Sequence, residues 1–323
     1  MLLVESLSEK LKGKNTKIIF PEGNDYRVLR AVIRLKKEGI IEPIILGNED
    51  EIKKLAESEG VKLGDIKIID PNKYEEFDKM VDSFVERRKG KVNAEEAKTI
   101  LKDPNYFGTM YVYMGYADGM VSGANHTTAE TVRPALQIIK TKKGIKRTSG
   151  AFVLLKEDKI YVMADCAINI DIDAEGLAEI AVLTDETARK FGLNPKIAML
   201  SFSSHGSAKH ERVTMVEEAT RIAKEMNPNM VIDGELQFDA AFVEEVAKKK
   251  APDSPLKGHA NVFIFPNIEA GNIGYKLIQR FGGYKAIGPI LQGLNEPVND
   301  LSRGCVEEEV YDLAIVTAAE AAL

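Results

Sequence analysis

The sequence lacks the short motifs that identify several common classes of enzyme. No two of its 25 glycines are spaced as G-x-G, so the dinucleotide fingerprint is absent, and so is the phosphate loop GxxxxGK[ST]. HExxH fails because Thr214 stands where the second histidine is needed. The two cysteines, Cys166 and Cys305, form no CxxC pair and no zinc pattern. Several enzyme classes are thereby removed, while cofactors held without a motif stay open.

Long apolar runs are also missing. No stretch approaches the roughly 18 residues that a membrane span needs. The N-terminal stretch carries Glu5 and Glu9 within its apolar pattern, which predicts an amphipathic helix and not a signal peptide. So few cysteines indicate a reduced, cytoplasmic protein. The formal net charge of −6 disfavours nucleic acid and acidic membranes as partners, so anionic substrates would need local cations.

The chain does contain a regular alternation of short β-branched runs and helical patterns. KIIF at 17–20 predicts a strand, and 25–39 a helix with apolar residues at helical spacing. With 323 residues, two domains are expected. The pattern predicts right-handed βαβ units, and therefore two α/β domains with mostly parallel sheets and an interdomain cleft. The best boundary lies near 141–150.

Several further elements are predicted from the same patterns. Residues 72–102 are expected to form a long polar helical segment, and AFVLL and KIYVMAD a strand pair linked by KEDK. NDLSRGC at 299–305 is expected to be a loop, followed by a closing helix over 306–323.

Polar segments follow four of the predicted strands or loops, where open α/β sheets form their sites. In 121–136, Thr127 and Glu130 predict a capping box whose helix N-terminus suits an anion, and Arg133 could reach the same place. A well-capped helix with a surface arginine is the alternative.

The other three segments have equally plain alternatives. Ser203, Ser204 and Ser207 suit a phosphate-binding turn or an ordinary βα turn. Residues 265–276 predict a glycine-rich corner that a ligand could approach, or a tightly packed helix. Residues 299–305 offer an arginine suited to gripping phosphate or carboxylate, or a capped helix with a solvated arginine.

Together these segments resemble the phosphate acetyltransferase (phosphotransacetylase) family, in order and over nearly the whole chain. The resemblance is carried by FVERRKGK, YFGTMYVYMGYADGMVSGANHTTAETVRPALQIIKT, MADCAINI, MLSFSSHGSAK, DGELQFDAAFV, ANVFIFPNIEAGNIGYK and GPILQGLNEPVNDLSRGC. It implies an isocitrate/isopropylmalate dehydrogenase-like fold and a homodimer. It also implies a first domain of 1–146 and 296–323 and a second of 147–295. The implied reaction is acetyl-CoA plus phosphate giving acetyl phosphate plus coenzyme A, with no metal and no cofactor beyond that substrate.

The resemblance also implies roles for single residues. Ser302 and Arg303 match the family's active-site pair, in which the arginine would grip the phosphoryl group and the serine would hydrogen-bond the developing oxyanion or the leaving oxygen. Arg133 matches an arginine implicated in holding coenzyme A, and Arg87 or Arg88 matches a second.

Three more residues, from segments that follow strands, complete the predicted substrate-binding set: Ser122, Ser207 and Asn267.

One position departs from the family pattern. The family usually has an aspartate six residues after the arginine, where this chain has Glu309, with Glu308 as a neighbouring candidate. A carboxylate there would take the proton of the coenzyme A thiol, which attacks directly as a thiolate in a ternary complex. The extra methylene moves the oxygens by about 1.5 Å, and a misplacement near 1 Å can cost on the order of 100-fold. Cys305 is assigned to packing.

Three alternatives stay open. Phosphate butyryltransferase shares the fold and the chemistry. A non-catalytic protein that binds coenzyme A or acyl phosphate could result from loss of the base. A metal- and NAD(P)-dependent 2-hydroxy acid dehydrogenase of the same fold would need a cluster drawn from Asp165, Asp171, Asp173 and Asp233.

Overall fold

The computed structural model describes residues 3–323 and divides into two compact units. The first unit consists of Val4–Lys142 and Leu294–Leu323, and the second contains Lys143–Gly293. Two α/β units with mostly parallel sheets agree with the predicted fold class. The domain boundaries at 146/147 and 295/296, and the isocitrate dehydrogenase-like assignment, stay predictions.

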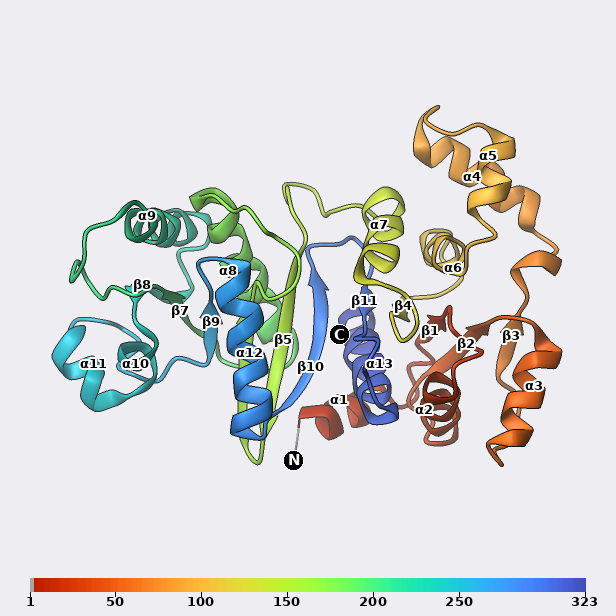
Figure 1. The fold of residues 1–323 in the computed structure, drawn as a ribbon, viewed down its shortest axis with the longest axis horizontal. Helices are drawn as coiled ribbons and strands as arrows, with labels where there is room; N and C mark the ends of the chain where they lie inside the picture. Colours follow the sequence, from red (N-terminus) through yellow and green to blue (C-terminus); the bar gives the residue numbers. More distant parts are fainter. Residues whose placement is uncertain (1–2) are drawn as a thin grey trace. The chain divides into compact units, whose positions relative to one another are not determined.

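The first unit is built on a five-stranded parallel sheet of order β11-β4-β1-β2-β3. Its strands are β1 (Lys17–Phe20), β2 (Glu42–Leu46), β3 (Lys67–Ile69), β4 (Gly119–Ser122) and β11 (Val298–Asp300). Its helices are α1 (Leu3–Leu11), α2 (Tyr26–Lys37), α3 (Glu49–Ser58), η1 (Pro71–Lys73), α4 (Phe77–Arg88), α5 (Ala94–Ile100), α6 (Pro104–Tyr113), α7 (Thr128–Ile138) and α13 (Glu307–Ala322). Helices α2 and α13 cover one face of the sheet, and α6 and α7 cover the other (Figure 1).

The core of the first unit explains why these elements form. Strand β1 sends three fully buried residues, Ile18 to Phe20, into the middle of the sheet. Every residue of α13 from Val310 to Ala319 is buried, because this helix packs against β4, β1 and α2 together. Asp25 begins α2 by accepting the backbone N–H of Arg27 at 2.8 Å.

The second unit carries a mixed six-stranded sheet of order β10-β5-β6-β9-β7-β8. Its elements are β5 (Ser149–Lys156), β6 (Lys159–Ala164), α8 (Ala174–Lys190), β7 (Lys196–Leu200), α9 (Glu211–Met226), β8 (Val231–Leu236), α10 (Phe238–Phe242), α11 (Glu244–Lys250), β9 (Val262–Ile264), α12 (Ile268–Gly282) and β10 (Lys285–Gln292). The predicted hairpin is present as the antiparallel pair β5 and β6. Strands β6, β9, β7 and β8 run parallel, as the βαβ pattern predicts.

Two sequence predictions were wrong in detail. The expected long helical segment over 72–102 is instead divided into η1, α4 and α5. Helix α4 ends because Lys89 and Gly90 adopt positive φ angles of 50° and 76°. The expected loop at 299–305 begins as strand β11, which pairs in parallel with β4. Within residues 3–323, none of the helices combines the length and apolar character required to cross a membrane.

Candidate active site

The turn between β4 and α7 is organised around a single buried carboxylate. Glu22 lies just after β1, is 2% exposed, and accepts the backbone N–H groups of four consecutive residues, 123–126, at 2.7 to 3.0 Å. The N–H of Thr127 goes to the Glu130 carboxylate, which completes the predicted capping box. The expectation that N–H groups at this turn bind an anionic ligand is therefore corrected for residues 123–127, because protein carboxylates already occupy them.

The same carboxylate raises the pKa of a neighbouring histidine, His126. Glu22 lies 2.7 Å from Nδ1 of His126. Burial alone would raise the pKa of Glu22, but hydrogen bonds from His126, Asn125 and Ala124 outweigh it and hold that pKa below its usual value. The pKa of His126 is raised, chiefly by the hydrogen bond to Glu22. The pair therefore favours an ionised carboxylate beside an imidazolium.

The Ser302–Arg303 segment forms a tight turn beside β4. The N–H of Leu301 donates to the Ser122 carbonyl at 2.7 Å, and the N–H of Cys305 donates to the Ser302 carbonyl at 2.8 Å. Both the Ser302 and the Arg303 side chains are exposed on this turn. The structure thus presents the predicted pair to solvent at the carboxyl end of a parallel sheet, where α/β proteins place their sites.

Asp300 is the last residue of β11 and is nearly inaccessible. Its Oδ2 accepts the Thr128 hydroxyl at 2.7 Å, while its Oδ1 is buried without a hydrogen-bond partner among residues 3–323. Gly123 has a φ of +110°, and a Cβ there would lie 2.4 Å from that Oδ1. Burial, helped by the negative charge of Glu22, raises the pKa of Asp300 to about 6 against the opposing hydrogen bond from Thr128.

The two neighbouring glutamates Glu308 and Glu309, in the first turn of α13, have different partners. Glu308 pairs with Nη1 of Arg34 on α2 at 2.6 Å, so it is committed to helix packing. Glu309 is half-buried and accepts the N–H of Val306 at 3.0 Å, which caps the helix. Cys305 is 4% exposed, and burial raises the pKa of its thiol to about 11. A buried, protonated thiol is a poor nucleophile, which supports the packing role predicted for Cys305.

The predicted coenzyme A arginines fall into two kinds. The guanidinium of Arg87 donates to the carbonyls of Ile138 and Ile139 at the end of α7, at 2.6 and 2.9 Å. The Nε of Arg88 is buried and has no hydrogen-bond partner in the part of the chain that the structure describes. Arg133 is exposed, and both Arg88 and Arg133 act electrostatically on the phenol of Tyr106. Arg88 and Arg133 therefore lie around one tyrosine, while Arg87 also supports α7.

The remaining predicted binding residues serve the local structure. Ser122 is fully buried and donates to Oδ1 of Asn105 at 2.6 Å, so a direct substrate contact has no support in this arrangement. Ser207 is exposed, and its hydroxyl accepts the N–H of Ser204 at 3.0 Å. Asn267 caps α12 by accepting the N–H of Ala270 at 2.9 Å. The last two belong to the second unit.

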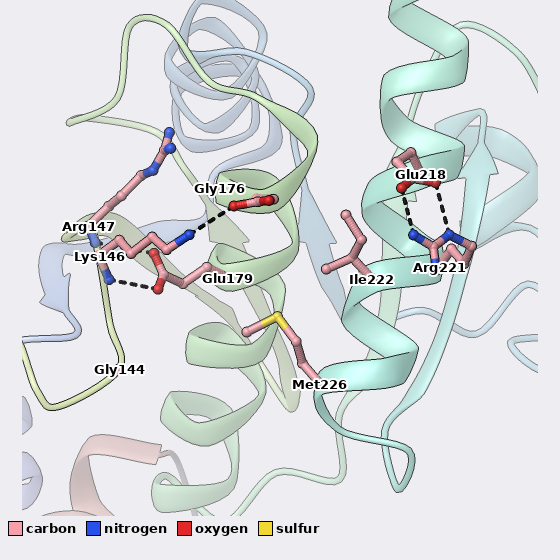
Figure 2. A pocket seen from close by; sticks show the side chains of 10 residues that line it. Gly144, Lys146, Arg147, Gly176, Glu179, Glu218, Arg221, Ile222 and Met226 are labelled. Atoms are coloured by element: carbon pink, nitrogen blue, oxygen red, sulfur yellow. Dashed lines mark hydrogen bonds and ion pairs between the residues drawn. The ribbon is translucent and has the colours of Figure 1, made fainter.

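Two polar cavities accompany these features. One of about 640 Å³ lies beyond β1, β2 and β3 in the first unit and is lined partly by Glu22, Asn125 and His126. The other, of about 320 Å³, lies between α8 and α9 in the second unit (Figure 2). Its charges pair among themselves, since Lys146 bonds Glu175 and Arg221 bonds Glu218. We assign it no ligand.

Three of the four aspartates that a dehydrogenase could draw on are engaged in local contacts, and the fourth, Asp171, is exposed. Asp165 accepts the N–H groups of Gly150 and Ala167, Asp173 caps α8, and Asp233 lies 3.1 Å from Nε2 of His205. Within residues 3–323, no group of three or more His, Cys, Asp or Glu side chains is arranged to hold a metal ion.

Comparison with known proteins decides the family. The family model described as Phosphate acetyl/butaryl transferase matches residues 2–318. The chain belongs to the phosphate acetyl/butaryl transferase family. This confirms the resemblance seen in the sequence.

Single proteins and solved structures show how similar the relatives are to this chain. The phosphate acetyltransferase of Bacillus subtilis is 57% identical over 319 residues, covering 99% of each chain. A phosphotransacetylase structure from Streptococcus pyogenes is 61% identical with a TM-score of 0.95, covering 99% of this chain and 98% of the other. A putative 4-hydroxythreonine-4-phosphate dehydrogenase from Salmonella typhimurium, at 15% identity and a TM-score of 0.56, covers 95% of this chain and 99% of its own and shares the fold alone.

Sequence reasoning missed the residues that hold the site together. Glu22 binds the β4–α7 turn, Arg27 binds both that turn and the Ser302–Arg303 turn, and Asp300 binds the start of α7. None of these three residues was assigned a role from the sequence. The segment PEGNDYR, which follows β1, offered the same signal used elsewhere, a polar stretch at the carboxyl end of a strand.

Asp300 predicts a distinct pH dependence of stability. Its folded-state pKa of about 6 lies above the ordinary value of 3.8, so folding favours the protonated form, and this contribution is lost as pH rises through 6. Asp300→Asn removes the titration and can still accept from Thr128. The unfolding free energy of the variant minus that of the parent should therefore rise by about 2 kcal/mol between pH 4 and pH 7.

Urea unfolding at several pH values measures this difference. Asp158→Asn, at an exposed position of the β5–β6 turn, provides the comparison for losing a surface carboxylate. A pH-independent difference for Asp300→Asn would show that the buried carboxyl keeps an ordinary pKa.

Proposed function

We propose that this chain catalyses the reversible transfer of an acetyl group between coenzyme A and phosphate, forming acetyl phosphate. The supporting observation is the exposed Ser302–Arg303 turn, held at the carboxyl end of a parallel sheet. It occurs in a chain that is 57% identical over 99% of its length to a phosphate acetyltransferase. A cytoplasmic location and the interdomain cleft stay predictions from the sequence.

The proposed mechanism is direct attack by the coenzyme A thiolate on the acyl carbon of acetyl phosphate. Arg303 neutralises charge on the departing phosphate, because a guanidinium binds two phosphate oxygens in a fork. The Ser302 hydroxyl donates to the oxyanion that develops on the carbonyl oxygen. The bond from sulfur to carbon forms as the bond from carbon to the phosphate oxygen breaks, and the thiol proton passes to a base.

Glu309 is the proposed base. Its hydrogen bond from the Val306 N–H fixes the carboxylate at the start of α13, six residues after Arg303. Only Oε2 is used in that bond, so the other oxygen is available to accept a proton. The ion pair of Glu308 with Arg34 favours Glu309 over Glu308 for this role.

A cluster of cations is proposed to hold the phosphate groups of coenzyme A. Arg87, Arg88, Lys89 and Lys91 lie close enough to Lys140 to lower its pKa, together with the desolvation of that lysine. Such mutual repulsion is relieved when a multiply charged anion binds. Arg133, near Arg88 at Tyr106, extends the cluster along α7.

Two alternatives keep a specific observation behind them. The family description covers both acetyl and butyryl transfer, so phosphate butyryltransferase is the second candidate. The glutamate at position 309 keeps open a protein that binds coenzyme A or acyl phosphate without turnover.

The homodimer is proposed to form through an apolar groove of the second unit. We call this the aromatic groove; its volume is about 330 Å³, and it is lined by Tyr161, Met163, Phe238, Phe242, Phe263, Leu277, Ile278, Phe281, Gly282 and Tyr284. Phe281 is 89% exposed and Leu277 is 49% exposed on α12. Contiguous apolar surface of this kind is typical of an interface between proteins.

The activity is tested by thioester formation from acetyl phosphate and coenzyme A, run beside butyryl phosphate. We expect faster turnover with the acetyl substrate. Arg303→Gln should lower kcat by about 100-fold or more. Glu309→Gln, whose amide oxygen can still cap Val306, should lower kcat by about 100-fold, whereas Glu309→Asp should stay active.

Each other result has a clear meaning. Faster turnover of butyryl phosphate would favour the second candidate. A folded protein that binds coenzyme A but turns over neither substrate would favour the binding protein. Full activity in Glu309→Gln would remove Glu309 as the base.

The two adjacent arginines give a second prediction. Arg88→Gln should raise KM for coenzyme A about tenfold and leave the melting temperature nearly unchanged, because the side chain has a free Nε. Arg87→Gln should raise this KM and also lower the melting temperature, since two α7 carbonyls lose their donor. Arg221→Gln, whose guanidinium pairs with surface glutamates of α9, is the control. An unchanged KM in both variants would place coenzyme A elsewhere.

The aromatic groove gives a third prediction, which concerns the oligomeric state. Phe281→Lys places a charge at the most exposed apolar residue of the groove and should shift the protein from dimer to monomer in light scattering after gel filtration. Ile170→Lys, at a residue that is 71% exposed and does not line the groove, should leave the mass unchanged. A dimer that survives Phe281→Lys would place the interface on another surface.

A further inference from the structure

Arg27 connects the two loops that form the candidate site. Its Nη1 donates to the carbonyl oxygens of Arg303 and Cys305, both at 2.9 Å. Its Nη2 donates to the carbonyl of Ala124 in the β4–α7 turn at 2.8 Å. One guanidinium thus binds three main-chain carbonyls from two segments that are far apart in the sequence.

The guanidinium is itself held in one orientation. Asp25, the cap of α2, accepts from Nε at 3.0 Å and from Nη2 at 2.7 Å. The Arg27 and Asp25 side chains are only 13% and 7% exposed. A largely buried arginine paired in a fork with a carboxylate loses little further freedom when it binds other groups.

All donors of Arg27 are therefore in use. A guanidinium carries five N–H groups. Two go to Asp25, two to the Arg303 and Cys305 carbonyls, and one to Ala124. None is left for a phosphate or an acyl group, so Arg27 does not touch substrate with a donor.

We propose that Arg27 is a positioning residue, which sets the place of the Ser302–Arg303 turn relative to the β4–α7 turn during acyl transfer. This inference rests on the proposed function. Bonds between Ser302, Gly304 and Cys305 hold the shape of the turn, and the Leu301 N–H anchors it on the sheet. Without Arg27, the carbonyls at 303 and 305 lose their common donor. The main chain that carries the exposed side chains of this turn is then no longer held in one position.

A lysine cannot replace this contact set. It offers three donors from one ammonium centre, and it lacks the planar fork that meets Asp25. Arg27→Lys keeps the charge but should displace the turn by a fraction of an ångström or more. Because displacements near 1 Å can cost about 100-fold, kcat should fall by about 30- to 100-fold. KM for coenzyme A should stay within about threefold, because the cation cluster on α4 and α7 is untouched.

The experiment measures kcat and both KM values for Arg27→Lys and Arg27→Ala, with melting temperature and circular dichroism as checks on folding. Millimolar guanidinium ion should restore part of the kcat of Arg27→Ala, and equal concentrations of ammonium or sodium should not. Arg30→Ala, on the same helix and paired with Glu59, is the matched control and should keep parental kcat.

The outcomes separate this inference from the proposed function. A parent protein without turnover would refute the function before Arg27 is considered. An active parent, together with a folded Arg27→Lys of unchanged kcat, would overturn the positioning role alone. A rise in KM for coenzyme A without a fall in kcat would also overturn it, because the role would then be in binding. If Arg27→Ala does not fold, Arg27→Lys alone decides between these results.

Discussion

The buried carboxylate of Glu22 is the fixed point on which the candidate site depends. It takes four consecutive N–H groups of the β4–α7 turn, and five residues later Arg27 donates to three carbonyls of that turn and of the Ser302–Arg303 turn. The segment that runs from the end of β1 into the first turn of α2 therefore supplies both residues. Glu22 accepts the N–H groups of one loop, and Arg27 donates to the carbonyls of both loops. Backbone groups that would otherwise lie unsatisfied at the sheet edge are paired.

The hydrogen bonds of Glu22 and Arg27 limit which groups of the two turns can contact a ligand. Several main-chain groups of both loops are bonded to Glu22 or Arg27, which supports the proposal that side chains such as Arg303, Arg88 and Arg133 recognise the anions. In a chain with a net charge of −6, these cations must act locally. The buried Asp300 lies behind the same turn, where it contacts the start of α7 and not solvent.

Much of the fold could be read from periodicity, and the capping box at Thr127 from residue spacing, because those signals are local. Strand β11 was not predicted, since its polar Asn299 and Asp300 look like loop residues. Both are buried only because Thr317 on α13 and Thr128 on α7 pair with them. The resemblance located Ser302 and Arg303, but it could not reveal that their turn is held by an arginine some 276 positions earlier in the chain. Partners at that separation leave no pattern in a single sequence.

The order of the chain has a consequence for how the first unit is made. Strand β11, the candidate catalytic turn and the buried helix α13 are synthesised only after the whole of 143–293. Until then, β4 is an unpaired edge, and the apolar surface of β1 and α2 that α13 covers is open to water. A nascent or truncated chain that ends before β11 therefore exposes apolar surface and an open strand edge in its first unit, although residues 143–293 of the second unit are complete.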